Sequence, residues 1–189
     1  MFVRTFPSSP TDEQIAYHLK QITYARIDNW LDTDFLTWGW WLQLILFILS
    51  LFVWWKLVEK KRLMEITFLG FLMMTVVIWL DQVGFELGIW YYTIDLIPVF
   101  PPATTIDYVM LPVIYSLVYQ YCRSWITFLA AVFILAGIFS FVCEPLLNIL
   151  GFYVLIEWHY YYGFPVYMAL GIVFKFVIEK IKSISENAR

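Results

Sequence analysis

The chain has 189 residues, of which 62% are hydrophobic, 21% aromatic and only 14% charged, and its mean hydropathy is +0.73. Soluble domains contain about 45–50% apolar and about 25% charged residues, so this composition indicates a membrane protein. The net charge of −3 argues against a nucleic-acid partner, and two cysteines are too few for a disulfide scaffold or a zinc ribbon.

Residues 1–37 are predicted to form an extracytoplasmic segment of their own. Thr11 and, three residues later, Gln14 resemble a capping box. Apolar residues then follow at helical spacing from Ile15 to Ile22. The pattern predicts a short amphipathic helix on the outer face of the membrane. A frayed polar tail packed loosely on the membrane domain is the alternative.

Five apolar stretches are predicted to cross the membrane. A span needs about 20 mostly apolar residues, because the hydrocarbon layer is about 30 Å thick and a helix rises about 1.5 Å per residue. The fold class is therefore predicted to be all-α, a polytopic transmembrane bundle of about five spans within residues 38–180, with a cytoplasmic tail at 181–189. The stretches are 38–55, 63–80, 105–122, 125–142 and 163–178.

The distribution of basic residues predicts the orientation of these spans. Segments 81–107 and 144–162 contain no Lys or Arg, whereas the other connections and the C-terminal segment do. Basic residues favour cytoplasmic loops, so a cell-membrane protein with its N-terminus outside and its C-terminus in the cytoplasm is expected. A sixth span at 145–158 is rejected, because that segment has only 14 residues and begins with Pro145. It is predicted to lie along the outer surface, with Glu144 closing the fourth span.

The two outer loops contain the residues most suited to chemistry. Asp107, Glu144 and Glu157 lie there with His159, and no Lys or Arg is present to pair with their carboxylates. A partly dehydrated acidic surface can hold a cation or exchange protons. The competing interpretation is that these acids only mark the membrane boundary. Neither H-E-x-x-H nor E-x-x-H occurs, so no metal site and no cofactor are predicted.

The third stretch, 105–122, is the most polar of the five. Tyr115 and Tyr119 lie four residues apart, hence on one helical face, and Gln120 follows directly. These hydroxyl groups are interpreted either as hydrogen-bond donors to neighbouring helices or as the lining of a polar substrate path. Pro112 lies in the same stretch and predicts a kink.

Three segments carry a resemblance to a known family. In chain order they are ELGIWYYTIDLIPVFPP, DYVMLPVIYSLVYQY and FVCEPLLNILGFYVLIEWHYYYGFPVY. They resemble an uncharacterised family of small multi-spanning membrane proteins from endospore-forming Gram-positive bacteria. The resemblance covers roughly residues 38–180, implies an integral membrane protein without an assigned activity, and draws attention to Asp107, Gln120 and Glu144. The matching positions are Trp90, Tyr91, Pro98, Asp107, Pro112, Gln120, Tyr121, Glu144, Pro145 and Trp158.

Three functions are compatible with these features. A small scaffold or accessory membrane subunit is favoured over an enzyme, and it would act through membrane lipid, a protein partner or a second copy of the chain. The alternatives are a small-solute or ion-coupled carrier that uses the outer acidic and aromatic residues, and a lipid-acting enzyme or sensor that uses Glu144, Glu157 and His159. Glu144 and Asp107 facing one buried cavity would favour the carrier or the enzyme, whereas both facing solvent would favour the scaffold.

Overall fold

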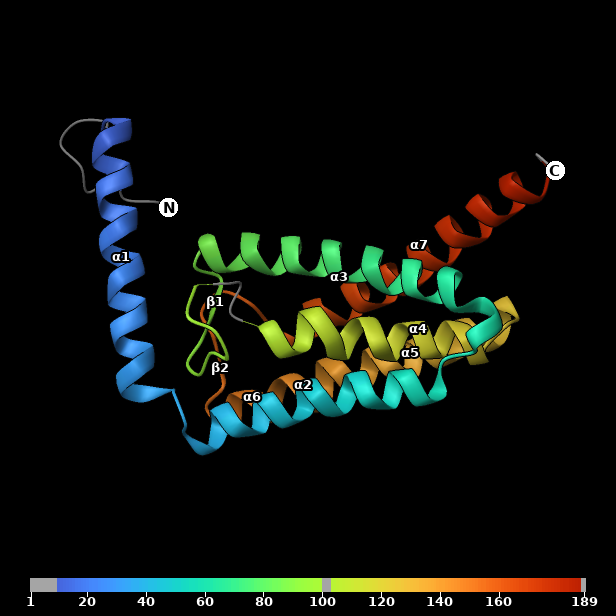
Figure 1. Ribbon diagram of the computed structural model, residues 1–189, viewed down its shortest axis with the longest axis horizontal. Helices are drawn as coiled ribbons and strands as arrows, with labels where there is room; N and C mark the ends of the chain where they lie inside the picture. The colour runs from blue at the N-terminus through green and yellow to red at the C-terminus, as the bar shows by residue number, and fades with distance from the viewer. Residues whose placement is uncertain (1–9, 100–102, 188–189) are drawn as a thin grey trace.

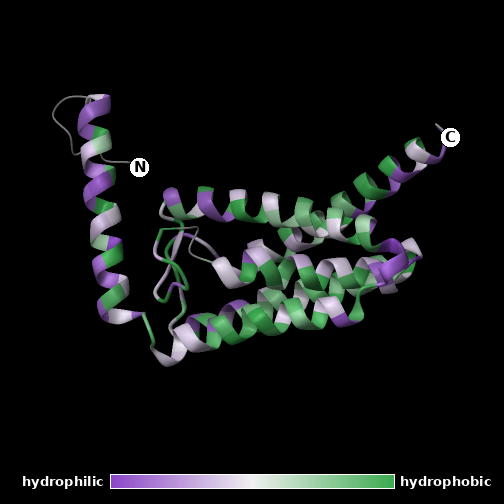
Figure 2. Cartoon of the chain, in the orientation of Figure 1, coloured by the Kyte–Doolittle hydropathy of each residue, from purple (hydrophilic) through white to green (hydrophobic). Residues whose placement is uncertain are grey.

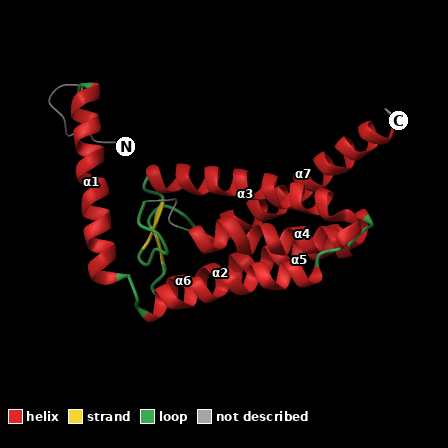
Figure 3. Ribbon diagram, viewed as in Figure 1, coloured by secondary structure: helices red, strands yellow, loops and turns green. Residues whose placement is uncertain are grey.

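The computed structural model describes residues 10–99 and 103–187, and this part of the chain is mostly helical (Figure 3). The prediction of a helical fold is therefore confirmed, although two short strands are also present. Three helical runs are long and apolar enough to cross a membrane. They are Trp38–Leu57, Lys60–Glu86 and Trp125–Ile149.

The helices of the bundle run lengthwise beside one another (Figure 1). The core between α3, α4, α5 and α7 contains Met73, Val132 and Phe174, all less than a tenth exposed. Large apolar side chains also cover the outside, where Phe71 is 58% and Ile126 83% exposed. Figure 2 colours much of the length of the bundle helices as hydrophobic. Such a surface fits a lipid environment. The bundle helices are α2 (Trp38–Leu57), α3 (Leu63–Glu86), α4 (Leu111–Tyr121), α5 (Trp125–Ile138) and α7 (Tyr160–Asn187).

Two π-helical segments interrupt the bundle, and each precedes a proline. Segment η2 (Ile106–Met110) leads into α4 just before Pro112, and η3 (Phe139–Cys143) leads into α6 (Glu144–Ile149) just before Pro145. Proline lacks an N–H and its ring clashes with the carbonyl four residues earlier, so an α-helical hydrogen bond is lost at each site. Single π turns accommodate such interruptions and are frequent at functional sites.

Glu144 was predicted to close the fourth span at the outer surface, and this placement is corrected by the structure. The helical run Trp125–Ile149 continues past Glu144, whose side chain is 7% exposed. The prediction failed because the first charged residue was taken as the end of the span. Within the segment 145–158, α6 occupies the first part and a strand the second, and Leu146, Ile149 and Ile156 are exposed.

The helices α3 and α6 end in the same way. Gly88 (φ 68°) and Gly151 (φ 76°) take the left-handed conformation that commonly terminates a helix. A short strand follows each glycine, β1 (Trp90–Tyr92) and β2 (Tyr153–Leu155), and the two pair antiparallel with Tyr92 opposite Tyr153. The strand pair closes one end of the bundle (Figure 1).

Helix α1 (Asp12–Thr33) stands apart from the bundle at this same end (Figure 1). The capping box is confirmed, because the Thr11 N–H donates to Gln14 Oε1 at 3.0 Å and the Gln14 N–H donates to Thr11 Oγ1 at 3.3 Å. The helix has 22 residues, longer than predicted, and none of them is buried. Residues 1–9 of the predicted segment lie outside the described residues. The predicted C-terminal tail is helical up to Asn187.

Candidate functional site

Three carboxyl groups line one cavity of about 280 Å³ near the strand-paired end of the bundle. Asp81 comes from α3, Asp107 from η2 and Glu144 from α6. Their side chains are only 8%, 4% and 7% exposed. Aromatic rings form much of the remaining wall, namely Trp90, Tyr92, Tyr153, Trp158 and Tyr167.

Asp81 is held in place by the first strand. The indole N–H of Trp90 donates to Asp81 Oδ1 at 3.0 Å, and the Tyr92 hydroxyl donates to the same oxygen at 2.7 Å. Gly84 makes this approach possible, because a Cβ at that position would lie 2.1 Å from the Trp90 ring. The turn at Gly88 therefore folds β1 back over the last turns of α3 and brings two donors to one carboxyl group.

Asp107 lies against Asp81, and the two carboxyl groups are within hydrogen-bonding reach of each other. Oδ2 of Asp81 and Oδ2 of Asp107 are both buried without a hydrogen-bond partner. Two buried carboxylates in contact repel each other unless a proton or another cation lies between them. This pair is therefore arranged to hold a positive charge.

Glu144 supplies the third carboxyl group. The Tyr167 hydroxyl donates to Glu144 Oε1 at 3.0 Å, and Oε2 is buried without a partner. Gly163 of α7 allows this packing, because a Cβ there would lie 2.6 Å from Glu144 Oε1. Helices α6 and α7 thus approach closely enough to bury the carboxyl group beside Ser140, whose Oγ also lacks a partner.

The charge of this cavity is not balanced by the protein. Among the described residues that line it there is no Lys, Arg or His. Burial, followed by the charge of Asp81, raises the pKa of Tyr92 well above its ordinary value, and burial raises the pKa of Tyr153 in the same direction. These hydroxyl groups keep their protons, so they can serve as donors but cannot act as bases near neutral pH.

A compact metal centre does not fit the described residues. No group of three or more His, Cys, Asp and Glu side chains in residues 10–99 and 103–187 is close enough to hold a metal ion. Asp81 and Asp107 form one acidic group, and Glu144 lines the same cavity without joining them as a coordination shell. This arrangement can accommodate a proton or a cation that fills the space between the two groups.

Two of the predicted site residues, Asp107 and Glu144, line this cavity. Glu157 and His159 are exposed instead, and the His159 ring packs 5.3 Å from that of Tyr161 and 5.5 Å from that of Tyr162. Their closeness to Glu144 in sequence therefore does not produce a common cluster. The chain does stay at the cavity, because Trp158 lines it, but the side chains of Glu157 and His159 on either side of Trp158 are exposed and do not line it.

Tyr115, Tyr119 and Gln120 make hydrogen bonds between elements of the bundle. Tyr115 donates to the Tyr167 carbonyl at 2.8 Å, and Tyr119 donates to Glu65. The Gln120 amide donates to the Leu57 carbonyl at 2.9 Å. None of the three lines the acidic cavity. These contacts match the interpretation that Tyr115 and Tyr119 donate hydrogen bonds to neighbouring segments of the bundle.

Asp81 is the site residue that sequence reasoning missed. It directly follows the predicted second span, 63–80, and so falls in the predicted outer segment 81–107, yet α3 continues to Glu86. The available signal was the helix-compatible sequence after Asp81, which ends only at the turn glycine Gly88. Because α3 continues past Asp81 for more than one further turn, this acid lies within the bundle and is only 8% exposed.

The opposite end of the bundle contains a different acidic cluster. Glu65 lies 2.8 Å from the Arg62 guanidinium and 3.6 Å from Lys182 Nζ. Glu59 lies 3.6 Å from Arg123, and Glu179 lies 3.7 Å from Lys175 Nζ. Each of these acids has a cationic partner.

Comparison with known proteins gives no further identification. No protein-family model matches the chain, and no curated protein and no solved structure matches it. The relationship to the family from endospore-forming bacteria therefore stays a prediction based on resemblance.

Proposed function

We propose that this chain is a five-span membrane protein that binds a cationic solute between Asp81, Asp107 and Glu144, as a small carrier would. The observation that carries the proposal is that each carboxyl group lines one cavity, is more than nine-tenths buried and has an oxygen without a hydrogen-bond partner. Burying an unpaired carboxylate is costly, and a bound cation offsets that cost. Acids inside a membrane domain commonly mark ion or substrate pathways.

The arrangement of the bundle supports five crossings. Besides the three long apolar runs, η2 with α4 and the first part of α7 lie lengthwise in the same bundle (Figure 1). The basic turn Lys60–Arg62 and Arg123 lie at the end opposite the strand pair (Figure 1). The positive-inside rule then favours an extracytoplasmic N-terminus, a cytoplasmic C-terminus and a cavity on the outer side of a cell membrane.

A scaffold or accessory role is the second candidate. Helix α1 has no buried residue and exposes Ile15, Leu19 and Ile22, so it is available to lipid or to a protein partner. The lipid-acting enzyme has less support, because Glu157 and His159 are exposed and do not line the cavity with Glu144. The common burial of Glu144 and Asp107 favours the carrier over the scaffold as the primary proposal.

The proposal is tested by titrating tetramethylammonium into the full chain in nanodiscs of an uncharged galactolipid. Trp90 and Trp158 line the cavity, so binding should change tryptophan fluorescence. We expect saturable binding by the wild type, and at least tenfold weaker binding by Asp107→Asn and by Glu144→Gln, because each removes one negative charge. The exposed acid Glu157 provides the matched control, Glu157→Gln, which should bind like the wild type. Equal binding by all four proteins, or none by the wild type, would contradict the proposal.

A further inference from the structure

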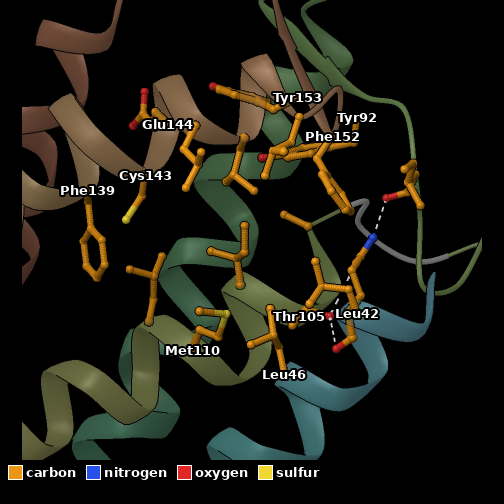
Figure 4. A pocket seen from close by; sticks show the side chains of 18 of the residues that line it. Leu42, Leu46, Tyr92, Thr105, Met110, Phe139, Cys143, Glu144, Phe152 and Tyr153 are labelled. Carbon is orange, nitrogen blue, oxygen red and sulfur yellow. Dashed lines mark hydrogen bonds between the residues drawn. The ribbon is translucent and has the colours of Figure 1, made fainter. Parts of the chain in front are cut away.

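A second cavity, of about 230 Å³, lies beside the acidic one. Its wall is almost entirely apolar, and Figure 4 shows Leu42, Leu46, Met110 and Phe139 around it. Two polar residues at its margin, Gln43 and Thr105, already have partners. The Gln43 amide donates to the Ile94 carbonyl at 2.7 Å, and the Thr105 hydroxyl donates to the Gln43 carbonyl at 3.3 Å. This cavity is therefore suited to hydrocarbon rather than to a polar solute.

The apolar cavity and the acidic cavity share part of their walls. Glu144, Tyr92, Tyr153 and Tyr167 belong to both. Glu144 and Tyr153 lie at the margin of the apolar cavity in Figure 4. The same tyrosines thus present ring surface to one cavity while Tyr92 and Tyr167 donate hydrogen bonds to carboxyl groups of the other. A ligand with one charged and one apolar end matches this division.

The head of such a ligand can be specified further. Carboxyl groups and aromatic faces together are the combination that recognises an organic ammonium ion. A phosphate on the same head would be disfavoured, because no Lys, Arg or His is among the described residues that line either cavity. A zwitterionic phospholipid head is excluded on this ground, and a simple amine or quaternary ammonium is favoured.

We infer that the bound solute is a cationic amphiphile, with an ammonium head between Asp81, Asp107 and Glu144, an apolar chain in the neighbouring cavity, and no phosphate. The inference rests on the proposed function and names its class of ligand. The chain contributes binding energy through burial in the apolar cavity, and the head fixes the orientation through the three carboxyl groups.

The test is an alkyl series titrated into the full chain in the same uncharged nanodiscs, with empty nanodiscs as the blank. From tetramethylammonium to hexyltrimethylammonium, we expect the wild-type affinity to rise about fourfold per methylene, as burial of hydrocarbon predicts. Hexylphosphocholine has the same chain and an added phosphate, and it should bind at least tenfold more weakly than hexyltrimethylammonium. The negative phosphate would lie close to carboxyl groups that no protein cation balances, and the like charges repel.

A pair of variants on α2 tests where the chain lies. Leu46→Trp fills the apolar cavity and should abolish the dependence on chain length while leaving tetramethylammonium binding unchanged. Leu49→Trp, at a position that is 50% exposed and does not line the cavity, is the control and should retain the dependence. The series on the wild type remains decisive even if Leu46→Trp does not fold.

The outcomes separate the two proposals. Saturable binding of tetramethylammonium with the same Kd for every chain length would overturn the amphiphile inference and leave the proposed cation binding intact. Hexyltrimethylammonium binding that Asp107→Asn does not weaken would also overturn it, because the head would then lie elsewhere. Absence of binding by every member of the series would overturn both.

Discussion

The two ends of the bundle differ in whether their acidic residues have cationic partners. At the end with the basic turn, Glu65 is paired with Arg62 and Lys182, and Glu179 with Lys175. At the strand-paired end, tyrosine and indole groups donate hydrogen bonds to Asp81 and Glu144, and no described cation lines the cavity. An acid whose charge is matched by the protein stabilises the fold. An acid whose charge is left unmatched is available to a ligand.

We call the end with the basic turn the paired end, because its acids form ion pairs. The end with the two strands is the unpaired end, because its carboxyl groups have no cationic partner among the described residues. Variants at the paired end are expected to lose stability, whereas neutralising variants at the unpaired end are not. Both sets of acids lie within one small bundle, so their effects can be measured on the same protein in the same lipid. The expected differences are given in order of size.

The largest loss is expected for Lys175→Met at the paired end. Lys175 is 1% exposed, and its Nζ donates to the carbonyls of Cys122 at 3.1 Å and Arg123 at 2.9 Å. Removing the ammonium group leaves both carbonyls without this donor, which should lower the free energy of unfolding by about 3 kcal/mol. Thermal unfolding measures the loss, with the exposed Lys180→Met as the control. Equal melting temperatures for the two variants would contradict the prediction.

A smaller loss is expected for Glu65→Gln. The substitution removes the charge that Arg62 and Lys182 share and weakens the acceptor of the Tyr119 hydroxyl. Because the Glu65 side chain is 19% exposed, water partly compensates, and a destabilisation of about 2 kcal/mol is expected. The exposed Glu186→Gln should change stability by less than about 0.5 kcal/mol. A Glu65→Gln protein as stable as this control would show that the paired end does not depend on its ion pairs.

The sign should reverse for Asp107→Asn at the unpaired end. The amide removes one carboxyl charge from the contact with Asp81 and can donate a hydrogen bond to it, so the ligand-free protein should gain about 1 kcal/mol at pH 8. Thermal unfolding without added ammonium ligand measures this gain. A loss larger than about 1 kcal/mol would mean that Asp107 is a structural residue rather than a binding residue.

The smallest effect concerns pH and Asp95, which lies in the loop after β1. Burial, followed by the charge of Asp34, raises the pKa of Asp95 from 3.8 to about 7. The native state therefore binds this proton more tightly than the unfolded chain, and the contribution to stability is lost as the pH rises from about 4 to about 7.

We expect Asp95→Asn to remove a pH-dependent loss of about 1 kcal/mol in that range, since partial exposure of the loop reduces the full effect. Melting curves between pH 4 and pH 8 measure it, with the exposed Asp32→Asn as the control. Parallel pH profiles for the wild type and Asp95→Asn would contradict the assignment.

Much of the helical architecture follows from local sequence. Long apolar runs predict the three helices able to cross a membrane, and Thr11 with Gln14 predicts the start of α1. The strand pair was not predicted, because three residues after a glycine are too few to show the alternation of a strand. Its two halves, 90–92 and 153–155, are separated in sequence by three α-helices and two π-helical segments, so no local pattern relates them.

The acidic cavity could be predicted only in part for a related reason. Asp107 and Glu144 stood out as acids in apolar sequence, but their depth depends on π-helical segments and on close packing at Gly163. Asp81 was assigned to a helix end because a hydropathy pattern does not show that α3 continues. Glu157 was included because it lies in the same predicted outer loop as Glu144, although its side chain is exposed and does not line the cavity.

The central claim is that the unpaired end binds one cation, and equilibrium dialysis against labelled tetramethylammonium tests it most directly. The wild type in uncharged nanodiscs should bind one equivalent, and Asp107→Asn/Glu144→Gln should bind none at the same ligand concentration. A wild type that binds no tetramethylammonium, or a double variant that binds one equivalent, would contradict the account.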